Sequence, residues 1–144
     1  MMPDREAIER MVPHAGSMCL LEAVTAWDAG HIACSAAEPG AGHPLARDGC
    51  VPAVAACEYA AQASAVHGAL LDDAHGPRAG MLAKLMEVRL HSRCFPAGGG
   101  PLAVRAELLG RTAAGCLYAF DVASIGTPVA SGRLMVAFAP VGRP

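Results

Sequence analysis

The sequence is short of aromatic residues, which make up only 4% of its 144 residues although 53% are hydrophobic. Much of that hydrophobic content is alanine, so we expect a core with fewer large side chains than the composition suggests. The net charge is only −2, which argues against a broad electrostatic surface for nucleic acid. The length favours a single domain over residues 1–144, large enough for a hydrophobic core.

The sequence also lacks any C-x-x-C pair, although it has six cysteines. Scattered cysteines give no signature of a zinc or redox site, so we expect no metal, no cofactor and reduced, mostly buried thiols. Such thiols are typical of a cytoplasmic protein. The charged N-terminal stretch MMPDREAIER has no apolar segment of the kind found in a secretion signal.

One long apolar stretch is present, GCVPAVAACEYAAQASAVHGALL at residues 49–71, and it is long enough to span a bilayer. Polar side chains lie within it, however, and a charge near the bilayer centre costs about 2.5–3.5 kcal/mol. We therefore expect no membrane span but a buried helix of a soluble protein, with Pro52 in its first turn and its end near Leu71. Glu58 is the only carboxylate in this stretch.

Most of the remaining sequence alternates apolar and polar residues as strands do. Two such segments precede the long helix and four follow it, at residues 17–27, 31–38, 84–93, 103–110, 115–124 and 127–138. We expect a short helix after Pro3, a loop over 39–49 and a hairpin turn at AGGGP, residues 97–101. A helix that is apolar nearly all round must be covered on most sides. The pattern therefore predicts an α+β domain with a curved antiparallel sheet of about six strands wrapped around that helix.

Two stretches resemble the 3-hydroxyacyl-(acyl carrier protein) dehydratases, which have the hot-dog fold. MVPHAGSMCLLEAV (residues 11–24) is similar to their N-terminal segment, and VPAVAACEYAAQ (residues 51–62) to the start of their central helix. Together with the loop at residues 47–49, Arg-Asp-Gly, the match is closest to the divergent subgroup of aryl-polyene-type pathways. The resemblance covers nearly the whole chain. It implies the hot-dog fold and a dehydratase of fatty acid or polyene biosynthesis.

In that family a histidine removes a proton from the carbon beside the thioester carbonyl, and an acid on the central helix protonates the departing hydroxyl. The resemblance assigns the acid to Glu58. It also places the backbone N–H groups that polarise the carbonyl near Ala53 and Val54, at the positive end of the helix. Exclusion of water would favour the protonated carboxyl of Glu58, unless this acid only forms a buried structural pair. Gln62, one turn further on, either orients Glu58 or makes a polar contact of the helix.

The base is harder to assign. The family carries its histidine in a His-Phe-Pro-Gly motif fourteen residues before the helix acid, where this chain has Pro44. His43 is one position away and is one candidate. His14 is the other, although its equivalent in the family is usually structural. Either one of these two is the base or the chain has lost it. The other histidines are expected on helix ends or strand surfaces without a role: His31, His67, His75 and His91.

Three functions therefore remain open. The chain is a dehydratase acting on a 3-hydroxyacyl group carried by acyl carrier protein through phosphopantetheine, a weak or inactive subunit that pairs with an active dehydratase, or an acyl thioesterase in which the helix acid activates water. We expect a homodimer or a heterodimer with a related hot-dog chain, because the sheet edges and one helix face would otherwise stay open. Four basic residues form either a rim for the acidic carrier and its phosphate or ordinary solvated faces: Arg47, Lys84, Arg89 and Arg93.

Overall fold

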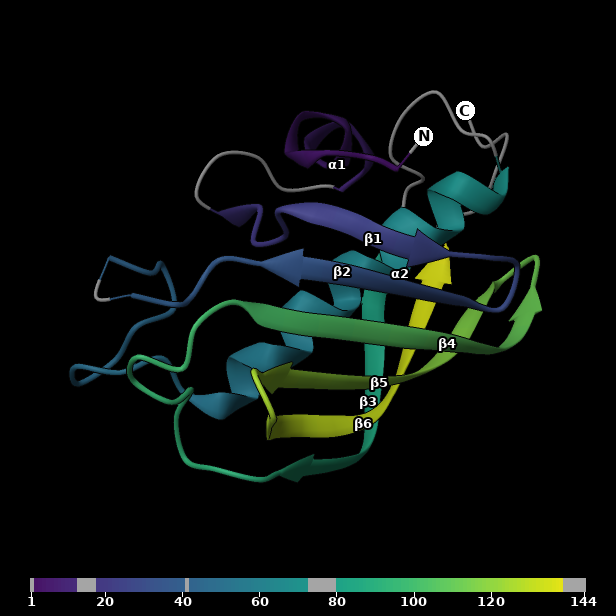
Figure 1. Ribbon diagram of the computed structural model, residues 1–144. Coiled ribbons are helices and arrows are strands. Elements are labelled where there is room, and N and C mark those ends of the chain that lie inside the picture. The colour runs from purple at the N-terminus through teal and green to yellow at the C-terminus, as the bar shows by residue number, and fades with distance from the viewer. Residues whose placement is uncertain (1, 13–17, 41, 73–79, 139–144) are drawn as a thin grey trace.

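The computed structural model of the chain describes residues 2–12, 18–40, 42–72 and 80–138. Within these ranges, one antiparallel sheet curves around one long helix, which is the hot-dog arrangement expected from the sequence (Figure 1). The strands lie in the order β1-β2-β4-β5-β6-β3. The elements are α1 (Arg5–Met11), β1 (Ala23–Trp27), β2 (His31–Ala36), a 3₁₀ turn (Ala53–Ala55), α2 (Ala56–Asp72), β3 (Gly80–Leu90), β4 (Leu102–Thr112), β5 (Gly115–Ser124) and β6 (Thr127–Phe138).

The core lies between the inner face of the sheet and α2. Alternate residues of β5 point inward as predicted, and their side chains are buried: Cys116, Tyr118, Phe120 and Val122. The helix packs against β2, β4, β5 and β6, and its Ala56, Ala60 and Ala63 are completely buried. Because alanine has no side chain beyond Cβ, the helix backbone can approach the sheet closely, and tyrosine and phenylalanine from the strands fill the remaining space.

The short helix α1 lies beside β1 (Figure 1). The Asp4 side chain caps it by accepting a hydrogen bond from the Ala7 N–H at 3.0 Å. The segment before the helix is joined to β1, because the Val24 N–H donates to the carbonyl of Pro3. Ile8 anchors α1 in the core with no exposed surface. Within the described residues, no helix is long and apolar enough to cross a membrane.

The AGGGP segment at residues 97–101 is not the predicted hairpin. β3 pairs with β6, whereas β4 pairs with β2 and β5, so this segment carries the chain from a sheet edge to its middle. Glu38 holds it in place, because its carboxylate accepts hydrogen bonds from the N–H groups of Gly98 and Gly100 at 3.1 and 2.8 Å. Both glycines have positive φ values, which other residues adopt at a cost. The same turn residues suit a hairpin and a crossover, so composition could not separate the two.

β3 forms one edge of the sheet and contains a bulge. Its pairing with β6 shifts register between Met86 and Arg89, and Glu87 has a φ of 53°. Gly132 of β6 faces this bulge, where a Cβ atom would come within 3.0 Å of the Val88 Cα. A side chain at this position would therefore crowd the backbone of the bulge, and glycine avoids this. β3 also exposes Leu82, Leu85 and Leu90.

The cysteines differ from the expectation of six reduced thiols. Cys50 and Cys94, 44 residues apart, form a disulfide with a Cα–Cα distance of 6.1 Å. The prediction was wrong for this pair because no local motif marks two cysteines that only the fold brings together. The other four are buried and form no disulfide: Cys19, Cys34, Cys57 and Cys116.

Candidate functional site

The start of α2 is fixed against the segment that follows β3. The Phe95 N–H donates to the Val51 carbonyl at 2.9 Å, and the Ala53 N–H donates to the Arg93 carbonyl at 3.0 Å. Pro52 also forms an isolated β-bridge with Cys94. Two backbone bonds and a disulfide thus hold residues 50–53 in one position.

The backbone hydrogen bonds around residues 51–56 determine which N–H groups remain available to bind a ligand at the helix start. The Ala53 N–H, one of the two donors expected there, is occupied by Arg93. The Ala55 N–H donates to Pro52, and the Ala56 N–H to the carbonyls of Ala53 and Val54. None of the hydrogen bonds found among the described residues uses the N–H of Val54, and 53% of this residue is exposed. Among the described residues, the positive end of the helix therefore leaves the Val54 N–H without a backbone acceptor.

Gln62 holds Glu58 on the helix surface. Gln62 is buried, with 2% exposure, and its Nε2 donates to Glu58 Oε2 at 3.0 Å and to the Met18 carbonyl at 2.7 Å. Its Oε1 accepts a hydrogen bond from the Leu20 N–H at 2.9 Å. Because the backbone partners fix which end of the amide donates, the Glu58 oxygen is the acceptor. The structure thus brings the predicted acid and the predicted orienting residue together.

The face of α2 that carries Glu58 is the less covered one. Glu58 is half-buried rather than fully buried, and residues at spacings of three and four along the same face are also partly exposed: Val54, Ala61, Ala65 and Gly68. All of these neighbours are apolar or lack a side chain. Between Val54 and Gly68, Glu58 is the one carboxylate on this apolar face, one turn from the Val54 N–H.

His43 makes two ring hydrogen bonds that determine its protonation. Its Nδ1 accepts from the Leu45 N–H at 3.0 Å, so in the neutral ring the proton must lie on Nε2. Nε2 is 2.9 Å from Tyr59 Oη and donates to it. Burial lowers the pKa of His43, which favours this neutral form. Neither nitrogen then offers a lone pair, so a role as base requires the Leu45 bond to break.

Tyr59 is buried beneath this histidine. Burial raises its pKa to about 12, so the phenol keeps its proton at neutral pH. Its ring also lies 5.7 Å from that of Phe95, measured between centroids. His43 therefore joins the loop before α2 to the buried side of the helix. The other candidate base, His14, lies outside the described residues, as does His75.

His67 is not on the surface, where we expected it, but completely buried. Its Nε2 donates to the Asp28 carbonyl at 2.8 Å, and its Nδ1 accepts from the Tyr118 hydroxyl at 2.7 Å. Burial lowers the pKa of His67, so the ring is held neutral. It joins α2 to β5 and to the turn between β1 and β2. Sequence gave no signal for this role because Tyr118 is 51 residues away.

The remaining two histidines lie at the surface, as expected. His31 pairs with Asp28 at 2.9 Å, and this hydrogen bond lowers the pKa of the Asp28 carboxyl. His91 Nε2 lies 3.3 Å from Ser131 Oγ. Neither histidine is close in sequence to the start of α2, and in the described part of the chain neither forms a hydrogen bond with that segment.

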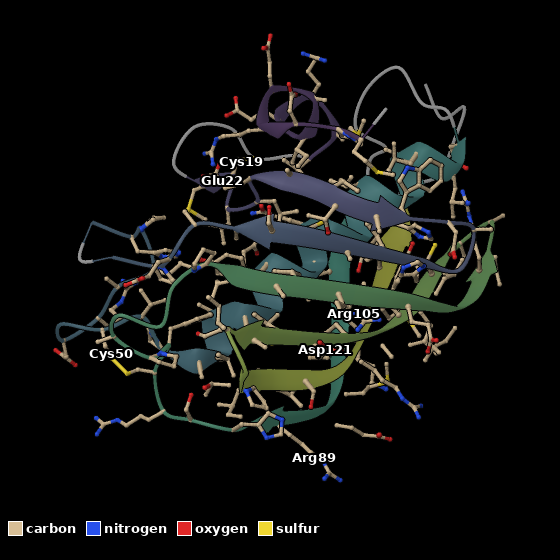
Figure 2. All side chains as sticks on the ribbon, viewed as in Figure 1. Cys19, Glu22, Cys50, Arg89, Arg105 and Asp121 are labelled. Atoms are coloured by element: carbon tan, nitrogen blue, oxygen red, sulfur yellow. A yellow bond between two sulfur atoms is a disulfide. The ribbon has the colours of Figure 1, made fainter. Side chains whose placement is uncertain are left out.

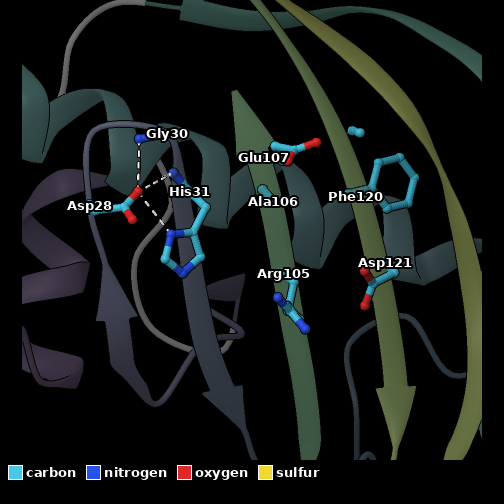
Figure 3. A pocket seen from close by; sticks show the side chains of 9 residues that line it. Asp28, Gly30, His31, Arg105, Ala106, Glu107, Phe120 and Asp121 are labelled. Carbon is cyan, nitrogen blue, oxygen red and sulfur yellow. Dashed lines mark hydrogen bonds and ion pairs between the residues drawn. The ribbon is translucent and has the colours of Figure 1, made fainter. Parts of the chain in front are cut away.

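A groove on the outer face of the sheet is separate from Glu58. It crosses β2, β4 and β5, and Figure 3 shows Asp28 and His31 at one side and Arg105, Glu107 and Asp121 on the strands beside them. Charges of both signs line it. The groove faces away from α2, so we give it no part in the chemistry of the helix.

The basic residues do not form one continuous rim. Arg47 begins a tight turn to Cys50 that places Asp48 and Gly49 at positive φ, and this turn is tied to Cys94 by the disulfide. Arg93, next to Cys94, is exposed and accepts the Ala53 N–H through its carbonyl. Arg47 and Arg93 thus flank the helix start. Arg89 and Lys84 lie further along β3, and Arg89 points outward from the sheet (Figure 2).

Comparison with known proteins gives one family match. A family model described as ApeP-like, ApeP dehydratase, matches residues 6–141. No curated protein gives a significant match.

Several solved structures are similar over nearly the whole chain. One is the dehydratase heterocomplex ApeI:P from Xenorhabdus doucetiae, with 26% identity, a TM-score of 0.80 and coverage of 93% of this chain and 91% of that one. Another is AziG from S. sahachiroi, with 16% identity, a TM-score of 0.65 and coverage of 92% and 100%. A mutant thioesterase, PA1618 from Pseudomonas aeruginosa, has 16% identity, a TM-score of 0.64 and 96% coverage of both chains. At such identities the last two show a shared fold alone.

Proposed function

Because the chain belongs to the ApeP-like dehydratase family, we propose that it is one subunit of a heteromeric hydro-lyase that removes water from a 3-hydroxyacyl thioester. Its dehydratase-like character follows from the family. The observation that carries the catalytic part is Glu58, held by Gln62 on the open face of α2 one turn from the Val54 N–H.

The reaction would proceed as follows in this site. A base removes a proton from the carbon beside the thioester carbonyl, and those electrons form the new carbon–carbon double bond. The carbon–oxygen bond at the next carbon breaks as the carboxyl of Glu58 gives its proton to the hydroxyl, which leaves as water. The Val54 N–H and the helix end stabilise the negative charge that develops on the carbonyl oxygen.

We assign the base to the partner subunit. The lone pair of His43 that a base would need accepts the Leu45 N–H instead. A second hot-dog chain that covers the open face of α2 would bring its own histidine to Glu58. The known ApeI:P structure is a dehydratase heterocomplex, which supports pairing with a related but different chain.

The free edge of β3 suits such a partner. Its outer side pairs with no strand among the described residues, and exposed leucines lie along it, namely Leu82, Leu85 and Leu90. Pairing there would bury apolar surface and satisfy backbone groups of the edge. A homodimer would use the same edge, so subunit composition must be measured.

We further propose an acyl carrier protein as the source of the substrate, in fatty acid or polyene biosynthesis. Arg47 and Arg93 flank the helix start, where the phosphate of a phosphopantetheine arm or an acidic carrier surface would meet them. We further propose a cytoplasmic location, in which the Cys50–Cys94 bond would be a redox-responsive exception among otherwise reduced thiols.

The test is dehydration of a 3-hydroxyacyl-carrier-protein thioester, followed by mass spectrometry, with the chain alone and with an ApeI-type subunit. Glu58→Gln, His43→Ala and His14→Ala are compared with Glu107→Gln, which removes an exposed carboxylate on the outer face of the sheet. We expect loss of water only with both subunits, abolished by Glu58→Gln and retained in Glu107→Gln and His43→Ala.

The other outcomes separate the alternatives. Full activity of Glu58→Gln in an intact complex would make the chain a non-catalytic partner. Activity of the chain alone that is lost in His14→Ala or His43→Ala, with the fold retained, would place the base in this chain. Release of free thiol without loss of water would identify a thioesterase and overturn the proposed reaction.

A further inference from the structure

The Cys50–Cys94 disulfide joins the two segments that fix the start of α2. We propose that it is a redox-sensitive clasp, opened by a dithiol, that controls the position of the Val54 N–H. Its effect on catalysis rests on the proposed function, whereas its chemistry and its effect on the helix start can be measured without any substrate.

The position of the disulfide supports this role. Cys50 closes the tight turn from Arg47, and the next residues lead directly to the 3₁₀ turn that begins at Ala53. On the other side, Cys94 lies between Arg93 and Phe95, whose backbones hold Ala53 and Val51. Opening the disulfide leaves these two backbone bonds in place. The helix start would therefore loosen rather than detach.

The other cysteines cannot take over the bond. Cys19, Cys34, Cys57 and Cys116 are at most 5% exposed. Burial raises the pKa of the Cys34 thiol to about 12, and also raises the pKa of Cys19 and Cys57, so few of these thiols form the reactive thiolate. Cys50 and Cys94, in contrast, are both partly exposed. A thiol reagent in solution can therefore reach the Cys50–Cys94 disulfide more easily than the four buried thiols.

Reduction of the disulfide proceeds in two exchange steps. A thiolate of an external dithiol attacks one sulfur of the pair, forming a mixed disulfide and releasing the other cysteine as a thiolate, which takes up a proton. The second thiol of the reagent then displaces the first cysteine. Cys50 and Cys94 gain two electrons and two protons in total, and the dithiol is oxidised to its own disulfide. A low-molecular-weight disulfide reverses the reaction.

The first experiment measures the clasp itself. The full-length protein is alkylated with iodoacetamide before and after dithiothreitol, and the modified peptides are located by mass spectrometry. We expect labelling of Cys50 and Cys94 only after reduction and little labelling of the buried cysteines. Hydrogen exchange over residues 50–56 should become faster in the reduced protein, while exchange in β5 stays unchanged. Free thiols at both positions before reduction, or equal exchange in the two states, would overturn the clasp.

The second experiment measures its effect on the site. Dehydration by the assembled subunits is compared in oxidised and reduced protein, in the double variant Cys50→Ser with Cys94→Ser, and in Cys34→Ala, which removes a buried thiol outside the clasp. Misplacement of a catalytic group by about 1 Å costs up to about 100-fold, so we expect a fall within that range on reduction. The double variant should match the reduced protein with or without dithiothreitol, and Cys34→Ala should respond as the wild type does.

The two proposals can fail separately. Faster exchange on reduction with no dehydration in either state would refute the proposed reaction and leave the clasp intact. Equal dehydration rates in the two states, in a protein whose exchange does change, would refute control of the site by the clasp. A partner subunit treated alone with dithiothreitol is the control for effects on the other chain.

Discussion

Two buried tyrosines give a matched test of the hydrogen-bond networks around α2. Tyr118 donates to His67 and Tyr59 accepts from His43, and each can be replaced by phenylalanine with the ring retained. His67 is completely buried, so Tyr118→Phe leaves its Nδ1 without a partner, at a cost of about 1–3 kcal/mol. His43 is partly exposed, and water can replace the lost contact. Tyr59→Phe should therefore cost only about 0.5–1.5 kcal/mol.

The assay is urea unfolding at neutral pH, with the slope m compared between variants so that a change in the unfolded state is recognised. A loss of 2 kcal/mol should also lower the melting temperature by about 6–8 °C in a chain of this size. If Tyr118→Phe and Tyr59→Phe lower the unfolding free energy equally, the reasoning is refuted, because buried His67 should lose more than His43, whose lost hydrogen bond water can replace.

The pH dependence provides a second measurement on the same proteins. Burial lowers the pKa of His67 in the folded state, so below about pH 6.5 the unfolded chain binds the additional proton. Stability should therefore be fully present above that pH and fall as the pH drops, by at most about 1.4 kcal/mol per pH unit for this one group. Tyr118→Phe removes a hydrogen bond to the neutral ring, which makes protonation easier. The difference between wild type and variant should shrink between pH 7.5 and pH 5.5, and a constant difference would contradict this explanation.

Three further substitutions or treatments test other parts of the structure. Gln62→Leu removes the partner of one buried and one partly buried backbone group, so we expect a loss of about 1–3 kcal/mol in urea unfolding together with slower dehydration by the complex; unchanged stability would contradict the role of Gln62 in holding Glu58 against residues 18–20. Gly115→Ala would place a Cβ atom 2.2 Å from the Val136 carbonyl oxygen and should lower stability by about 1–3 kcal/mol, whereas Gly110→Ala, with open space at its Cβ, should be close to neutral. Reduction of the disulfide, which spans 44 residues, should lower the unfolding free energy by up to about 4 kcal/mol, measured by urea unfolding with and without dithiothreitol; identical curves would mean that the bond adds no stability.

The elements could be predicted from the sequence because each depends on local periodicity. The alternation in β5 and the apolar stretch of α2 follow from residues a few positions apart, and both are found where expected. Strand neighbours are different, since they depend on pairing between distant segments. The glycine-rich segment before β4 illustrates this, because its residues permit a turn but do not say which strands it connects.

The site was predictable only as far as its residue types carried a signal. Glu58 stands out as one acid in an apolar helix, and Gln62 lies on the same face one turn later, so their contact was foreseeable. The protonation of His43 depends on the hydrogen bond that its Nδ1 accepts from the Leu45 N–H. Any residue at position 45 other than proline would supply this backbone donor, so the sequence does not indicate the bond. The same holds for His67 and for the disulfide, whose partners lie 51 and 44 residues away.

The bulge in β3 has a consequence for the free edge of the sheet. An exposed edge with several leucines is a template on which copies of a chain can stack into aggregates. Glu87, at positive φ, divides this edge into two short runs, and Lys84 and Arg89 add charges to it. A strand that pairs along the full edge would have to match this irregularity, so the bulge would hinder flat stacking of identical copies along β3.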